Sequence, residues 1–183
     1  ENVKKIPMAS LEDLVKLCDK AQEKYASYGI TTVQEGMMVK ELIPIYKKLV
    51  EDNKLYLDVI AYMDKKTEKD IRNAFKENIK KYKNRFKING IKIFLDGSPQ
   101  GRTAWMRTPY IDDKEYFGYG TMSDEEVKKD VEYAYEEKLQ ILAHCNGDKA
   151  AEQYIKAIKD TNKNCCNNAK IAVNISHLKI LYE

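Results

Sequence analysis

The chain has 183 residues, of which 33% are charged, yet its formal net charge is only +3. This length can bury the core of one domain but falls short of the roughly 250 residues that a closed eight-stranded (β/α) barrel takes. Lysines alternate with acidic residues in segments such as 64–83, a pattern typical of solvated helix faces rather than of a nucleic-acid site. No apolar run approaches the roughly 20 residues of a membrane span, so we expect neither membrane nor nucleic acid as a partner.

The four cysteines indicate the compartment. None forms a CxxC pair, and the adjacent Cys165 and Cys166 are poorly placed for a disulfide. The first residues also lack the pattern of a signal peptide. We therefore expect reduced thiols in a cytoplasmic protein.

Strands and helices are predicted to alternate along the chain. Ser10 begins the first helix with a capping-box-like sequence, and Ser123 begins another in the same way. The predicted helices cover 10–28, 38–51, 67–82, 123–138 and 148–160. The predicted strands cover 30–35, 55–63, 88–96, 139–145 and 169–176. An aromatic-rich loop is predicted over 99–121.

This order predicts an α/β fold with a parallel sheet and right-handed crossovers. About five strands are too few to close a barrel, so we expect a single domain, 1–183, that forms a partial (β/α)8 TIM barrel. Such a piece exposes two strand edges and apolar surface, which drive association. We therefore expect a homodimer with Val33, Val173 and Ile175 in or near the contact, testable by sedimentation equilibrium.

The predicted strand 88–96 contains charged residues, although buried strands contain few such residues. Side chains alternate in a strand, so Ile91, Ile93 and Leu95 share one face, whereas Lys92 and Asp96 share the other. A barrel, whose strand ends carry the chemistry, explains a lysine facing inward. A salt bridge from Lys92 to an aspartate within the sheet is the alternative.

Three segments together resemble the metal-dependent amidohydrolase superfamily, and more narrowly the branch called amidohydrolase family 3, or YtcJ-like. They are Gly29–Gly36 (GITTVQEG), Lys92–Trp105 (KIFLDGSPQGRTAW) and His144–Asp148 (HCNGD). The resemblance implies a central fragment of the catalytic barrel. The first barrel strand with its His-x-His motif, the last strand with its aspartate and the accessory β domain are absent from the 183 residues.

The resemblance also implies a metal site. Lys92, as a carbamate, with His144 and His177 would bind one or two divalent ions, expected to be zinc, which would be absent or partial in the fragment. Carbamate oxygen and neutral imidazole are suitable ligands for such ions. His177 stands in Ser-His-Leu-Lys, where the family often has Glu-His-Ala-Gln, so this position departs from the pattern.

Further polar residues near these segments are candidates for catalysis or substrate binding. Asp96 and Asp148 are the catalytic candidates, although an N-cap role would by itself explain Asp148. A small-molecule substrate would meet the loop that follows the strand, unless this loop only packs on the barrel rim. Its candidate binding residues are Ser98, Gln100, Arg102, Thr103 and Trp105.

The resemblance implies hydrolysis of amide-type C–N bonds other than peptide bonds by metal-activated water, and we expect the fragment alone to be inactive. Two alternatives stay open. Lys92 could act as a Schiff-base nucleophile in an aldolase-like lyase, or the chain could be a binding module without enzyme activity.

Overall fold

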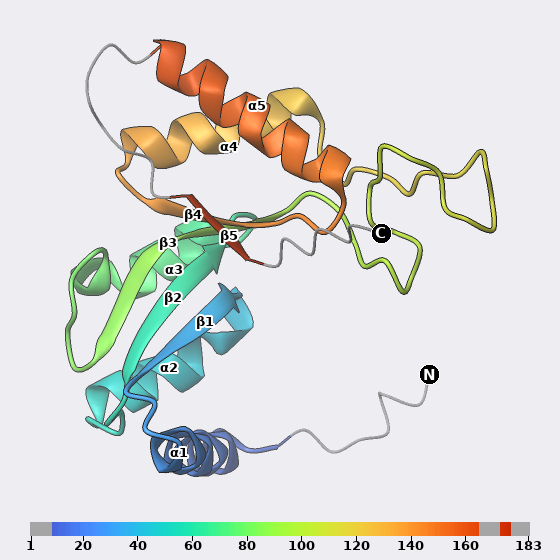
Figure 1. The fold of residues 1–183 in the computed structure, drawn as a ribbon. Coiled ribbons are helices and arrows are strands. Elements are labelled where there is room, and N and C mark those ends of the chain that lie inside the picture. The colour runs from blue at the N-terminus through green and yellow to red at the C-terminus, as the bar shows by residue number, and fades with distance from the viewer. Residues whose placement is uncertain (1–8, 165–172, 177–183) are drawn as a thin grey trace. The chain divides into compact units, whose positions relative to one another are not determined.

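The computed structural model describes residues 9–164 and 173–176, in which strands and helices alternate (Figure 1). The strands are β1 (Thr32–Met38), β2 (Asp58–Asp64), β3 (Phe86–Phe94), β4 (Gln140–His144) and β5 (Val173–Ser176). The α-helices are α1 (Leu11–Ser27), α2 (Ile43–Glu51), α3 (Glu68–Ala74), α4 (Asp124–Glu136) and α5 (Asp148–Asn164). Two short 3-10 helices are η2 (Lys40–Leu42) and η3 (Lys76–Asn78).

The chain divides into two units, Glu1–Asn89 and Gly90–Glu183. In the first unit β1 pairs with β2, and in the second β3 pairs with β4 and β4 with β5, each time in parallel. Parallel pairing needs a crossover, which the intervening helices supply. The fold is therefore α/β, a partial (β/α) barrel, as the sequence predicts.

Two helices begin where the sequence predicts. The Ser10 hydroxyl accepts the Asp13 N–H at 3.2 Å before α1. Before α4, the Ser123 hydroxyl accepts the Glu126 N–H at 3.2 Å, and the Glu126 carboxylate accepts the Ser123 N–H at 2.8 Å. Both sets of bonds satisfy N–H groups that a helix start leaves without a partner.

The helix predicted over 67–82 is wrong in its second half. α3 ends at Ala74, η3 follows, and the Asn78 side chain then donates to the carbonyls of Lys83 and Phe86 at 3.1 and 2.8 Å. Phe75 packs on Phe86 with 5.1 Å between ring centroids. Three nearby residues have positive φ, namely Lys80, Asn84 and Arg85. Burial of aromatic rings and side-chain bonds to the backbone thus override the local helical pattern.

Each unit has a buried apolar core. In the first unit, Tyr46 stacks on Phe86 with centroids 5.1 Å apart, and Leu49 and Met63 are also buried. In the second unit, β3 and β4 contribute buried side chains, and the helices contribute others. These are Ile91, Ile93, Ile141 and Ala143 from the strands, and Val127, Val131, Ala150 and Tyr154 from α4 and α5. Within residues 9–164 and 173–176, no helix has the length and apolarity needed to cross a membrane.

Candidate active site

The buried lysine lies on β3 in the second unit. Lys92 stands opposite Leu142, and Phe94 stands opposite His144, in the parallel pairing of β3 with β4. Neighbouring residues in register share a face of a sheet, so Lys92 and His144 lie on one face near the carboxyl ends of adjacent strands. As predicted, Ile91 and Ile93 are buried on the other face.

The environment of Lys92 disfavours its charge. The residue is only 7% exposed, and its Nζ lies 4.7 Å from the centroid of the Phe94 ring. Burial lowers the pKa of Lys92 from its usual value of 10.5, against a smaller opposite effect of Cys145. The amine therefore reaches its neutral, nucleophilic form at a lower pH than an exposed lysine does.

His144 ends β4 with a half-buried ring that lies 5.2 Å from the Phe94 ring. Phe94 thus contacts both Lys92 and His144. The Nε2 atom of His144 lies 2.9 Å from the Asn146 side-chain nitrogen and 4.0 Å from Asp96 Oδ1. His177, the third predicted ligand, lies outside the described residues.

Asp96 organises the loops around these residues. Its Oδ2 accepts the backbone N–H groups of Trp105 and Gly147 at 3.0 and 2.6 Å, and its Oδ1 accepts that of Asn146 at 2.9 Å. The side chain is fully buried. These bonds join the loop after β3 to the loop after β4, a structural role that stands beside the catalytic role predicted from the sequence.

Two predicted substrate-binding residues close the turn that follows β3. Thr103 Oγ1 accepts the Ser98 N–H at 2.9 Å, and Ser98 Oγ accepts the Gly101 N–H at 3.2 Å. A Cβ on Gly97 would overlap Thr103 Oγ1, so the turn requires glycine there. Gln100 is exposed at the tip of this turn.

Arg102 already has carboxylate partners within its own loop. Its guanidinium lies 3.1 Å from Asp112 and 3.5 Å from Asp113, and it stands over the rings of Tyr110 and Tyr116. Charge-assisted contacts of this kind are strong. The arginine thereby holds together the aromatic-rich loop, whose Tyr110 hydroxyl donates to the Ala104 carbonyl at 3.0 Å; substrate binding by Arg102 stays a prediction.

The N-cap role considered for Asp148 is wrong. α5 begins at Asp148 itself, and the carboxylate accepts the Arg107 N–H at 2.8 Å. Asp148 is exposed. Its bond to the Arg107 N–H anchors the aromatic-rich loop to the start of α5. Trp105 is anchored beside it, since Lys149 Nζ lies 5.0 Å from the Trp105 ring centroid.

The sequence analysis did not single out two residues of the HCNGD segment that help to form the candidate site. Asn146 contacts His144, and Gly147 packs against the Trp105 backbone so closely that a Cβ would overlap its carbonyl. Their place between His144 and Asp148 in the segment was the available signal. No spacing rule shows which backbone a loop glycine will meet.

We expect Gly147→Ala to destabilise the chain by about 1–3 kcal/mol, the usual range for overpacking. The added methyl group must push the Trp105 backbone away from Asp96, because both loops share this carboxylate. Urea unfolding measures the change. Gly101→Ala is the control, since the closest atom to its Cβ is the Ser98 hydroxyl oxygen at 3.1 Å, with no overlap of backbone; equal stability of the two variants would contradict the packing argument.

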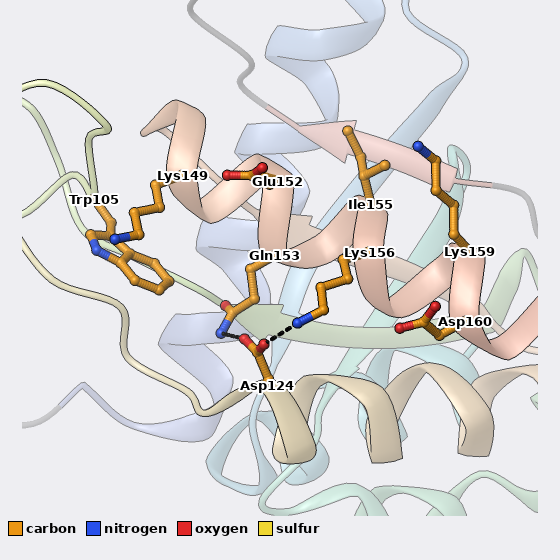
Figure 2. A pocket seen from close by; sticks show the side chains of 9 residues that line it. All are labelled: Trp105, Asp124, Lys149, Glu152, Gln153, Ile155, Lys156, Lys159 and Asp160. Atoms are coloured by element: carbon orange, nitrogen blue, oxygen red, sulfur yellow. Dashed lines mark hydrogen bonds and ion pairs between the residues drawn. The ribbon is translucent and has the colours of Figure 1, made fainter.

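A cavity of about 530 Å³ lies elsewhere in the second unit, along α5 and the start of α4 (Figure 2). Gln153 donates to Asp124 Oδ1 at 3.0 Å, and Lys156 lies 2.7 Å from Asp124 Oδ2. Neither Lys92 nor His144 lines this cavity. Trp105, a predicted substrate-binding residue, does line it, and Asp124 and Lys156 neutralise each other there.

The donors of the strand-end site suit a divalent ion only in part. Within the described ranges, no three His, Cys, Asp or Glu residues form a group that could bind a metal. Burial raises the pKa of the Cys145 thiol to about 12, so the thiol is protonated at neutral pH in the metal-free chain. The described donors are therefore His144 and, once converted to an anionic oxygen donor, Lys92.

The chain is similar to several known proteins. The family model described as "Amidohydrolase family" matches residues 2–181. A Bacillus subtilis protein named "Putative amidohydrolase YtcJ" is 35% identical over 72 residues, which are 39% of this chain and 14% of that protein.

Two solved structures are similar to the chain, both described as uncharacterized metal-dependent hydrolases. The one from Pyrococcus furiosus is 25% identical with a TM-score of 0.73, over 88% of this chain and 34% of its own. The one from Pyrococcus horikoshii OT3 is 27% identical with a TM-score of 0.71, over 84% of this chain and 31% of its own. The chain thus spans about a third of the length of these structures.

Proposed function

This chain belongs to the amidohydrolase family, and from this premise we propose that it forms part of the catalytic barrel of a longer metal-dependent hydrolase. The proposed reaction is hydrolysis of C–N bonds other than peptide bonds in a small-molecule substrate. The observation that carries the proposal is Lys92, a buried lysine that shares a strand-end face with His144.

The chemistry of Lys92 suits a carbamate. Only a neutral amine adds to carbon dioxide, and burial shifts Lys92 toward that form. The product is an anion with two oxygen donors, which prefers a metal partner to an apolar surrounding.

In the full-length protein, Lys92, His144 and His177 would hold one or two divalent ions, most simply zinc, together with ligands from the rest of the protein. Such ions lower the pKa of bound water and polarise a carbonyl group. The described residues of this chain position the ligands. Asp96 joins the loops that follow β3 and β4, and Phe94 contacts both Lys92 and His144.

We expect Lys92 to be unmodified in the 183-residue chain. A lysine carbamate reverts unless a metal stabilises it, and two or three ligands do not complete a site that retains zinc. Intact-mass spectrometry under non-acidic conditions should therefore give the mass of the plain sequence. An added mass of one carbon dioxide would show that partial ligation is sufficient.

For the same reason the chain alone should not hydrolyse amides. The full-length protein should hydrolyse small amides or cyclic amides, and a chelator should abolish this activity reversibly. Hydrolysis that survives exhaustive chelation would contradict the metal-dependent proposal.

A lyase that uses Lys92 as a Schiff-base nucleophile is the second candidate, because a lowered pKa also activates an amine toward carbonyl substrates. Borohydride with small aldehydes or keto acids separates the two proposals. A reduced adduct at Lys92, together with a turnover rate that chelators do not change, would favour the lyase.

A further inference from the structure

The side chain of Asn146 bridges two loops of the candidate site. Its nitrogen Nδ2 lies 2.8 Å from the Gly97 carbonyl oxygen and 2.9 Å from His144 Nε2. The backbone is fixed as well, because the Asn146 N–H donates to Asp96 Oδ1 at 2.9 Å. Both the backbone N–H and the side-chain amide of Asn146 are therefore hydrogen-bonded. These bonds restrict rotation of the side chain away from the His144 ring.

The Gly97 carbonyl determines which way the Asn146 amide points. A carbonyl oxygen only accepts hydrogen bonds, so it must face the amide nitrogen and not the amide oxygen. The same NH₂ group has a second hydrogen to donate, and His144 Nε2 lies 2.9 Å from the amide nitrogen. This nitrogen of the ring is therefore the acceptor.

A neutral imidazole has one protonated nitrogen and one lone-pair nitrogen. With Nε2 as acceptor, the proton of His144 belongs on Nδ1. This is the opposite of the Nε2–H form that predominates in free histidine. The Asn146 contact thus favours one tautomer of the ring.

We propose that Asn146 is the positioning residue of His144: it fixes the ring orientation and holds the metal-free ring in the Nδ1–H tautomer. The consequence for metal binding rests on the proposed function above. In this tautomer the lone pair lies on Nε2, where the Asn146 N–H already binds. A metal ion can use His144 only if Asn146 leaves Nε2, or if the proton moves from Nδ1 to Nε2 and displaces the Asn146 N–H there.

The tautomer can be read directly by ¹⁵N NMR of the metal-free chain, at a pH where the ring is neutral. The chain has two histidines, so a His177→Gln variant leaves one set of ring signals. We expect a protonated shift at Nδ1 and an unprotonated shift at Nε2 of His144. A protonated Nε2 would overturn the proposal.

Two variants separate positioning from general structure. Asn146→Ala should shift the ring toward the Nε2–H form, and so should Asn146→Asp, since a carboxylate only accepts. Asn73→Ala, on the exposed side of α3, should leave the tautomer unchanged. An unchanged tautomer in folded Asn146→Ala would overturn the proposal.

If both Asn146 variants fail to fold, a measurement on the wild-type chain still tests the proposal. This measurement is the NMR scalar coupling between Asn146 Nδ2 and His144 Nε2 across their hydrogen bond. Its presence supports the assignment, and its absence in a well-resolved spectrum overturns it. The metal proposal fails separately: a full-length protein without metal would refute it even if the tautomer is as expected here.

Discussion

Asp96→Ala is expected to lower the free energy of unfolding by on the order of 3–5 kcal/mol, among the largest effects in the chain. The carboxylate accepts three backbone N–H groups, from Trp105, Asn146 and Gly147. Alanine leaves all three without this partner in a region from which water is largely excluded. Trp105, the single tryptophan of the chain, donates one of these bonds, so its fluorescence in urea unfolding reports the change.

Two further variants test the origin of this effect. Asp96→Asn keeps one oxygen acceptor and should fall between wild type and Asp96→Ala. Asp112→Ala removes an exposed aspartate that pairs with Arg102 and should change stability by less than about 1 kcal/mol. If Asp96→Ala is no less stable than Asp112→Ala, the three backbone bonds do not organise the loops as described.

Lys92→Met in the full-length protein is expected to lower the hydrolysis rate by more than about a hundredfold. Loss of a residue that only supports a metal ligand costs about 10- to 100-fold, and loss of a ligand should cost more. Methionine keeps the length and apolar volume of the buried stem but cannot form a carbamate. Steady-state hydrolysis at saturating metal measures the effect.

A matched control and a rescue make this prediction specific. Lys156→Met changes an exposed lysine that pairs with Asp124 and should retain activity. In Lys92→Ala, a short carboxylic acid added to the buffer should restore part of the activity, because it offers the oxygen donors of the lost carbamate. Restoration by a short amine and not by the acid would point to the Schiff-base alternative.

The sequence predicted those features that depend on neighbouring residues. Alternation along β3 separates Ile91 and Ile93 from Lys92, and the Ser123 capping box starts α4, because both patterns are local. The end of the helix predicted over 67–82 was wrong. Phe75 packs on Phe86, and local hydrophobic periodicity does not predict contacts between residues this far apart in the chain.

The surroundings of the candidate site were harder to predict, since they join residues that are distant in the chain. Asp96 contacts Gly147, 51 residues away, and Arg107 contacts Asp148, 41 residues away. The pairing of Arg102 with Asp112 and Asp113 in its own loop was not predicted, because these partners follow no motif. Residue types at strand ends could be predicted, but their partners required the folded chain.

The most direct test of the central claim is elemental analysis of the full-length protein and its Lys92→Met and His144→Gln variants. The account predicts one or two equivalents of a divalent metal per chain in the wild type. It predicts a loss of at least one equivalent in Lys92→Met, a loss in His144→Gln, and no loss in Lys156→Met. Unchanged metal content in both Lys92→Met and His144→Gln would contradict a metal site at the ends of β3 and β4.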